Sequence, residues 1–113
     1  MGEFVKAATL SDIEPGKRLG VWVSGQRVLL FNIDGTLYAV DESCPHRECS
    51  MAEGALDGKV LDCPCHHAKF NLETGEVITE PNKYPPTPPL PVHQVKIEGW
   101  DILVSLSLEA DYT

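Results

Sequence analysis

Short runs of β-branched and aromatic residues, separated by turn residues, fill the first forty positions of the chain. Such side chains fit the pleated surface of a sheet, and both Ser24-Gly25-Gln26 and Asp34-Gly35 are typical of tight hairpin turns. The pattern therefore predicts a meander of short strands at residues 4–7, 19–23, 27–33 and 36–40. Between the first two strands we expect a single helical turn, capped by Ser11 or Asp12.

Strand-like runs return after residue 60. Residues 92–98 alternate between apolar and polar positions and residues 102–106 follow after a turn, which predicts a closing hairpin. Shorter strands are expected at residues 60–62, 69–72 and 76–78. Six prolines between residues 81 and 91 indicate a loop, because proline cannot donate to a strand ladder. No segment is periodic enough for a substantial helix, so the predicted fold class is all-β, a small sandwich or barrel.

The length and composition suit one globular domain. The chain has 113 residues, which we assign to a single domain over residues 1–113, and 42% of them are hydrophobic. The net charge of −8 argues against nucleic-acid binding and suits docking on a basic partner surface. No stretch approaches the ~18 apolar residues of a membrane helix, and the first residues contain no apolar signal core. We therefore expect a cytoplasmic protein that does not insert into membranes.

The candidate chemistry lies between residues 44 and 67, which hold all four cysteines and three of the four histidines. Cys44-Pro45-His46 is followed, after sixteen residues, by Cys63-Pro64-Cys65-His66-His67. Each segment offers a thiolate and an imidazole, which makes a set of two sulfur and two nitrogen ligands. Such a set suits zinc, or a cluster with one iron on Cys44 and Cys63 and another on two histidines. The spacing alone favours neither, whereas the mixture of ligand types in each loop suits two irons.

The combined pattern is similar to the Rieske [2Fe–2S] motif, which has the form Cys-x-His, a spacer, and then Cys-x-x-His. The matching segments are Cys44-Pro45-His46-Arg47 and Cys63-Pro64-Cys65-His66, and Gly54, Leu56, Phe70 and Thr74-Gly75 also fit. The resemblance covers most of the chain and implies a compact Rieske-type fold of stacked antiparallel sheets. It places the cluster at one tip, under two ligand loops within about residues 41–71 and under the proline-bearing loop.

The resemblance also implies the cofactor and the role of each ligand. A [2Fe–2S] cluster would have Cys44 and Cys63 on its buried iron. His46 and His66 would hold the outer iron, and their exposed edges would be the exit for the electron. Because imidazole is neutral where thiolate is an anion, the exchange of two thiolates for imidazoles raises the reduction potential. We therefore expect an electron carrier without catalytic residues, not an enzyme.

Two further cysteines, Cys49 and Cys65, match the disulfide cysteines of the high-potential Rieske proteins of cytochrome bc complexes. The resemblance thus implies a disulfide between them, whereas a reducing cytosol favours free thiols. The residues that follow the second ligand loop indicate a low potential instead. High-potential members carry Ser and Tyr hydroxyls that donate to cluster sulfur, but this chain has Ala68 and Phe70 at those places.

Residues outside the motif have weaker functional interpretations. His93 alternates within a predicted strand, and we expect it on a solvated face of that strand. His67, next to the second ligand loop's histidine, is expected to be an exposed loop residue. Trp22 and Trp100 are expected to contribute packing and not to relay electrons.

The small size of the chain and its resemblance to dioxygenase ferredoxins give the leading functional hypothesis. The protein would be the monomeric ferredoxin component of a bacterial aromatic-ring hydroxylating dioxygenase, carrying electrons from a flavin-dependent ferredoxin reductase to the terminal oxygenase. The redox alternatives are a quinol-side Rieske protein of a respiratory complex and the small Rieske subunit of an assimilatory reductase. A zinc-stabilised interaction module would use the same four ligands, and a thiol–disulfide oxidoreductase would use Cys49 and Cys65. The aromatic substrate is not encoded in this chain, because the terminal oxygenase selects it.

Overall fold

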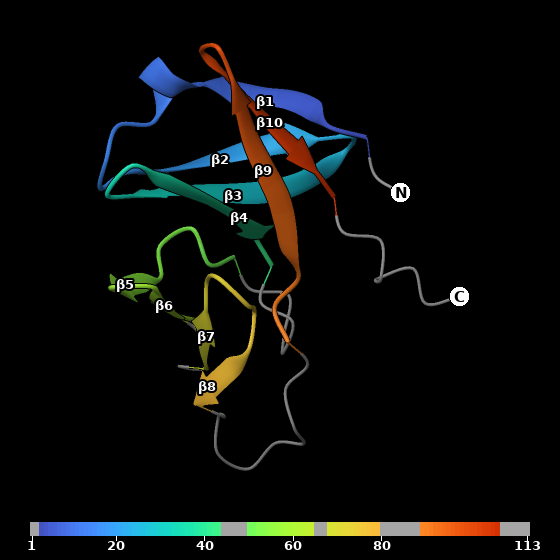
Figure 1. Cartoon of the computed structure of the whole chain (residues 1–113). Coiled ribbons are helices and arrows are strands. Elements are labelled where there is room, and N and C mark those ends of the chain that lie inside the picture. The colour runs from blue at the N-terminus through green and yellow to red at the C-terminus, as the bar shows by residue number, and fades with distance from the viewer. Residues whose placement is uncertain (1–2, 44–49, 65–67, 80–88, 107–113) are drawn as a thin grey trace.

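The computed structural model describes residues 3–43, 50–64, 68–79 and 89–106. Within these ranges the chain forms two antiparallel sheets and one short 3-10 helix (Figure 1). The larger sheet contains, in spatial order, β1 (Val5–Thr9), β10 (Asp101–Ser105), β9 (Val92–Glu98), β4 (Thr36–Asp41), β3 (Gln26–Ile33) and β2 (Arg18–Val23). The smaller sheet contains β5 (Ala55–Asp57), β6 (Val60–Asp62), β7 (Lys69–Asn71) and β8 (Val77–Thr79). No helix in the described part of the chain is long and apolar enough to cross a membrane.

Two-residue turns set the register of the β2–β3–β4 meander. Ser24 and Asp34 have positive φ angles of 50° and 54°, and each precedes a glycine that also has a positive φ, as in the type I′ turns of tight hairpins. The resulting registers place Trp22 opposite Arg27 and Val28 opposite Asp41. Because side chains alternate along a strand, these registers decide which residues share each face of the sheet.

Strand β3 is buried on both faces and separates two hydrophobic cores. Val28 and Leu30 belong to a core within the larger sheet, together with side chains of β1, β2, β4 and β10. Leu29 and Phe31 belong to a second core, which the smaller sheet shares. The other members of this second core are Val40, Met51, Leu61, Cys63, Ala68, Phe70, Leu72 and Leu90. A fully buried apolar side chain contributes about 1.5–3 kcal/mol, so this core holds the smaller sheet against the meander.

The fold class predicted from the sequence is confirmed: the chain is all-β, with antiparallel sheets stacked on one another. In Figure 1 the smaller sheet lies below the β2–β3–β4 meander. Between β4 and β5, and again between β6 and β7, the chain passes through the segments that contain the predicted ligands. The proline-rich segment follows β8 and leads into β9.

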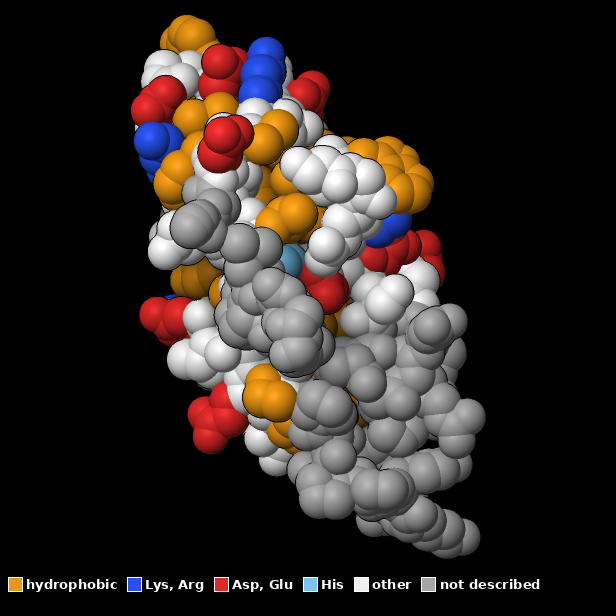
Figure 2. Space-filling model, turned by 90° about the vertical axis from the view of Figure 1, so that its right-hand side faces the viewer, with side chains coloured by type: hydrophobic (Ala, Val, Ile, Leu, Met, Phe, Trp, Pro, Cys, Tyr) orange, Lys and Arg blue, Asp and Glu red, His pale blue; other side chains and the backbone are white. Residues whose placement is uncertain are grey.

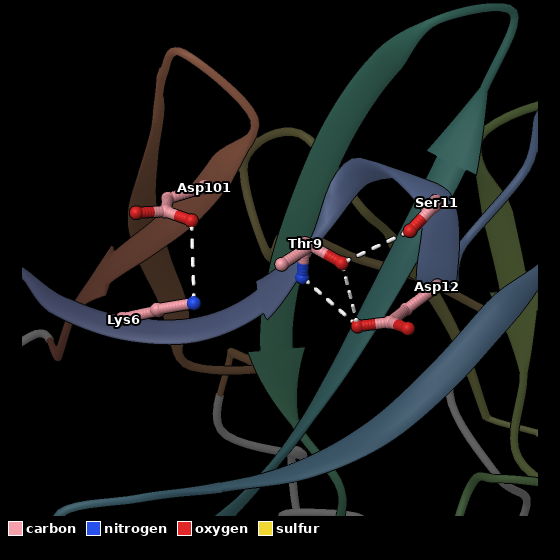
Figure 3. Close-up of polar contacts among 5 residues, drawn as sticks. All are labelled: Lys6, Thr9, Ser11, Asp12 and Asp101. Atoms are coloured by element: carbon pink, nitrogen blue, oxygen red, sulfur yellow. Dashed lines mark hydrogen bonds and ion pairs between the residues drawn. The ribbon is translucent and has the colours of Figure 1, made fainter.

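The turn after β1 differs from the prediction. The 3-10 helix η1 (Leu10–Asp12) has Thr9 as its N-cap, so the expected caps Ser11 and Asp12 were wrong. Asp12 instead completes a capping box, because its Oδ2 accepts hydrogen bonds at 3.0 Å from both the backbone N–H and the hydroxyl of Thr9 (Figure 3). The difference arises because β1 continues to Thr9, two residues beyond its predicted end, and moves the start of the helix.

Strand β5 is absent from the sequence-based prediction. It has three residues, of which only Leu56 is a large apolar side chain, so no alternation marks it. It pairs with β6 across the turn Gly58-Lys59, and the dipeptide Asp57-Gly58 is the only local sign of a hairpin there. A strand this short forms because its partner β6 is anchored in the core through Leu61.

Candidate metal centre

The structure places one of the four predicted ligands, Cys63. Cys44, His46 and His66 lie outside the described residues, as do Cys49 and Cys65 of the predicted disulfide. Among the residues that are described, no three His, Cys, Asp or Glu side chains come together as a metal site. The described flanks of both ligand loops nevertheless show where each loop begins and ends.

The second ligand loop leaves and rejoins the smaller sheet at neighbouring positions. The Cys63 backbone N–H, just after β6, donates to the carbonyl oxygen of Ala68, just before β7, at 2.8 Å. The Cys63 side chain is fully buried in the second core and forms no disulfide. A buried cysteine sulfur that forms no disulfide is a soft ligand that suits zinc or an iron–sulfur cluster.

The first ligand loop has an equally narrow base. Ser43 and Ser50 form an isolated antiparallel bridge, and the Met51 backbone N–H donates to the carbonyl oxygen of Glu42 at 2.8 Å. The predicted ligands Cys44 and His46 belong to residues 44–49, which join these two flanks in the sequence and lie outside the described residues.

The bases of the two loops are packed against each other. Met51 and Cys63 belong to the same buried core. Gly54 follows the first loop, and a Cβ atom there would overlap the carbonyl oxygen of Asp62 and come within 3.2 Å of a Leu61 methyl carbon. The absence of a side chain at Gly54 thus lets the chain after the first loop lie directly on β6, whose end carries Cys63. This arrangement fits a metal centre that takes ligands from both loops.

Two arginines of the larger sheet reach across to this region. Arg18 Nη1 donates to the carbonyl oxygens of Ala52 and Gly54 at 3.0 and 2.7 Å, and its guanidinium lies 5.1 Å from the centre of the Phe31 ring. Arg27 Nε donates to Glu42 Oε1 at 2.7 Å. The segment that carries the first ligand loop is therefore attached to the meander on both sides of the loop.

The carboxylate of Glu42, two residues before Cys44, accepts one hydrogen bond at each of its oxygens. Ser50 Oγ donates to its Oε2 at 2.6 Å, in addition to the bond from Arg27. The Ser50 hydroxyl and, to a smaller extent, Arg27 hold the pKa of Glu42 below its ordinary value, although partial burial opposes this shift. Glu42 is therefore a carboxylate at neutral pH. Arg18, Arg27 and Glu42 belong to no motif and were not predicted from the sequence.

The segment that leaves the proline-rich loop is fixed beside the same core. Leu90 is buried there, and its N–H donates to the carbonyl oxygen of Gly75 at 2.8 Å. The Asp41 N–H donates to the carbonyl oxygen of Pro91 at 3.1 Å. The part of the loop at residues 80–88 lies outside the described residues. Its described end thus joins the smaller sheet to the strand that enters the first ligand loop.

The expectation that His93 lies on a solvated face was wrong. The residue is buried, and its Nε2 lies 2.7 Å from Asp41 Oδ1, which also accepts a hydrogen bond from Gln26 at 2.7 Å. The register of β4 with β9 places Ala39 opposite His93, so this part of β9 is covered and not solvated. A polar residue that alternates with apolar ones can be buried if it faces a partly buried carboxylate, which the period of a strand does not reveal.

The residues expected to set the potential are buried beside Cys63. Ala68 and Phe70 are both fully buried in the second core, and neither has a hydroxyl.

Trp22 and Trp100 lie at the surface, with 65% and 78% of their area exposed. Asp and Glu side chains are spread over the face shown in Figure 2, in keeping with the net charge of −8.

Comparisons with known proteins give the same family as the motif. The chain matches the Rieske [2Fe-2S] domain model over residues 3–99. It is 41% identical over 108 residues to the biphenyl dioxygenase ferredoxin subunit of Pseudomonas sp. strain KKS102, with 95% of each chain covered. It is 34% identical over 105 residues to the ferredoxin component of the naphthalene 1,2-dioxygenase system of Pseudomonas putida, with 93% of this chain and 97% of the relative covered.

A solved structure agrees with these relatives. It is the complex of reduced oxygenase and oxidised ferredoxin in carbazole 1,9a-dioxygenase, and one of its chains superposes on this one with a TM-score of 0.79. The identity is 31%, over 90% of this chain and 92% of that chain.

The family match decides between zinc and two irons, which the ligand spacing left open. The buried sulfur of Cys63 and the adjoining bases of both loops fit a metal centre at this place in the fold. The chain therefore belongs to the Rieske [2Fe–2S] domain family, and its cofactor is the cluster of that family.

Proposed function

We propose that this protein is the ferredoxin component of a dioxygenase system that hydroxylates aromatic rings. The observation that carries this proposal is the similarity, over nearly the whole length of both chains, to ferredoxin components of two such systems. The bound cluster supplies one site that accepts and releases a single electron. The protein carries electrons and does not itself hydroxylate the ring.

The proposed cluster ligands are Cys44 and Cys63 on the inner iron and His46 and His66 on the outer iron. The complete burial of Cys63 supports its assignment to the inner iron. The backbone hydrogen bond between Cys63 and Ala68 closes the base of the second ligand loop directly at Cys63. It therefore supports the proposal that Cys63 and His66, from one narrow loop, bind the same cluster.

Substitution of the histidines tests this assignment. His46→Cys or His66→Cys adds a negative thiolate and should lower the reduction potential or abolish the Rieske spectrum. His67→Ala is the matched control, because it removes the neighbouring imidazole and should leave the spectrum intact. An unchanged spectrum in either cysteine variant, or its loss in the control, would overturn the assignment.

The proposed partners are a flavin-dependent ferredoxin reductase, which supplies electrons, and a terminal oxygenase, which receives them. The carbazole dioxygenase complex is a precedent for the second partner in a similar protein. The net charge of −8 supports docking on basic surfaces of both partners. We place this exchange in the cytoplasm and expect the protein to act as a monomer. Recovery in a membrane fraction after cell fractionation would contradict that placement.

Reconstitution tests the carrier role. In a mixture of NADH, the flavin reductase and the terminal oxygenase, turnover of the aromatic substrate should require this protein and should increase with its concentration. Anaerobic titration with dithionite should show uptake of one electron per chain. Turnover that proceeds equally without the protein would contradict the proposal.

A further inference from the structure

A chain of side-chain contacts runs from the surface of β2 to the base of the first ligand loop. We call Arg27, Glu42 and Ser50 the Glu42 clamp. Arg27 Nε donates to Glu42 Oε1 at 2.7 Å, and Ser50 Oγ donates to Glu42 Oε2 at 2.6 Å. Both carboxylate oxygens are therefore occupied, one by the larger sheet and the other by the returning flank of the loop.

The Arg27 end of the clamp is held in one orientation. Its guanidinium carbon lies 5.2 Å from the centre of the Trp22 ring on the opposing strand. The same guanidinium lies over Gly20, where a Cβ atom would overlap its Nη2. A stacked arginine that also makes a charge-assisted bond loses less freedom on binding than a free one. The exposed Trp22 thus has a local use, which is to brace Arg27.

The Glu42 end joins the two flanks of the loop. Its carboxylate accepts the Ser50 hydroxyl and its carbonyl oxygen accepts the Met51 N–H, so one residue before the loop holds two residues after it. Its side chain is only 16% exposed, and the hydroxyl of Ser50 also accepts the N–H of Ala52 at 3.1 Å. The remaining sulfur ligand, Cys63, is carried by the smaller sheet.

We infer that Arg27, Glu42 and Ser50 are positioning residues that hold the first ligand loop in register with Cys63 and thereby determine how long the cluster is retained. The inference rests on the proposed assignment of Cys44 and His46 as ligands. The clamp fixes the base of their loop to β3, while the hairpin between β6 and β7 fixes Cys63. Loss of any member frees one side of the loop, and the cluster then loses two of its four ligands more easily.

A purely electrostatic role would act differently. Glu42 and Arg27 carry opposite charges, so their removal would shift the reduction potential in opposite directions. Ser50 carries no charge, and its removal would have little effect. In the positioning role all three substitutions accelerate the loss of the cluster, because each removes a contact that holds the base of the first ligand loop. Isolated surface ion pairs contribute little, but this pair is partly buried and belongs to a network.

The test is the first-order rate at which the visible absorption of the holoprotein bleaches in excess iron chelator. Arg27→Met, Glu42→Gln and Ser50→Ala should each accelerate bleaching, by about three- to tenfold for the loss of one hydrogen bond of this kind. In the double variant with Arg27→Met and Glu42→Gln, the increase in the bleaching rate should be smaller than the product of the two single-variant increases, because both substitutions break the same clamp. Ser50→Ala removes only a hydroxyl, so it keeps the test decisive if a charged-residue variant fails to fold.

The pair Lys6–Asp101 provides a matched control. It joins neighbouring strands β1 and β10 at 3.3 Å (Figure 3), and neither strand is next to a ligand loop in the sequence. Lys6→Met and Asp101→Asn should leave the bleaching rate unchanged. Unchanged rates in all three clamp variants, with or without opposite shifts of potential, would overturn the inference while the cluster spectrum keeps the proposed function intact. A wild-type chain without that spectrum would overturn the ligand assignment itself.

Discussion

Gly75 lies where the smaller sheet meets the end of the proline-rich loop, and replacing it with alanine tests the packing around the cluster-bearing core. Its N–H donates to the Asn71 carbonyl oxygen at 2.7 Å, and its own carbonyl oxygen accepts the Leu90 N–H at 2.8 Å. Its φ is +80°. A Cβ atom there would overlap the Leu90 carbonyl oxygen and approach a Val92 methyl carbon to 3.0 Å. Because the nearer neighbour is a backbone atom, the segment that contains Leu90 would have to shift.

The magnitude follows from comparison with Gly58, which is in the turn between β5 and β6. Gly58 also has a positive φ, +62°, but nothing lies within 4 Å of a Cβ atom there. Gly58→Ala therefore pays only the left-handed backbone cost, about 1–2 kcal/mol. Gly75→Ala has the same backbone cost, and the displacement of the segment that contains Leu90 adds about 1–3 kcal/mol by analogy with overpacked cores. The total, about 2–5 kcal/mol, is a large part of the stability of a small domain.

Chemical denaturation of the holoprotein in guanidinium chloride measures both effects. We expect Gly75→Ala to lower the unfolding free energy by clearly more than Gly58→Ala does. It should also bleach faster in chelator, because the displaced segment adjoins the core that contains Cys63. Equal losses of stability in the two variants would refute the close approach of the proline-rich loop to the smaller sheet at Gly75.

Three further predictions concern single side chains. His93→Leu should lower the unfolding free energy by about 1–2 kcal/mol, because Asp41 loses a buried partner; an unchanged denaturation midpoint would contradict this. Hydrogen bonds from the Thr9 N–H and, to a smaller extent, from its hydroxyl lower the pKa of Asp12 in the folded protein from its ordinary value of 3.8. The ionised Asp12 therefore stabilises the fold above pH 3.8, and this contribution is lost as the pH falls through the lowered pKa. Asp12→Asn should therefore be less stable than wild type at neutral pH, with a difference that vanishes in acid; a difference independent of pH would contradict the shift. Phe70→Tyr adds a hydroxyl to the core beside the cluster loop and should raise the midpoint potential by about tens of millivolts, whereas a lower potential would refute its role in tuning.

The positions of the strands could be predicted from the sequence because tight turns punctuate them. The same turns also determine which residues of neighbouring strands lie opposite each other. The Asp34-Gly35 hairpin sets Arg27 level with Glu42, and the Ser24-Gly25 hairpin sets Trp22 opposite Arg27. Counting residues outward from the turns would therefore have revealed two contacts of the clamp. Ser50 could not be found in this way, because a loop and not a hairpin turn brings it to Glu42.

The ligand set could be predicted as a motif, but its surroundings could not. The motif names residue types and spacings, whereas Arg18 belongs to the larger sheet and bonds to the segment after the first loop, which leads into the smaller sheet. The misreading of His93 has a similar cause, since the pairing of β4 with β9 joins residues far apart in the sequence. Strand β5 was missed because Leu56 is its only large apolar residue, so its three positions show no strand-like run. Each of these features depends on tertiary contacts, which local pattern does not contain.

The midpoint potential of the purified holoprotein at neutral pH tests the central claim most directly. Rieske centres span about −150 to +300 mV, and hydroxyl donors to cluster sulfur favour the upper end because they stabilise the more negative, reduced state. Ala68 and Phe70 provide no such donors at the buried positions beside Cys63. A low-potential carrier in a dioxygenase system should therefore titrate near the bottom of the range. A value near the top would contradict the account and would favour a quinol-linked partner instead.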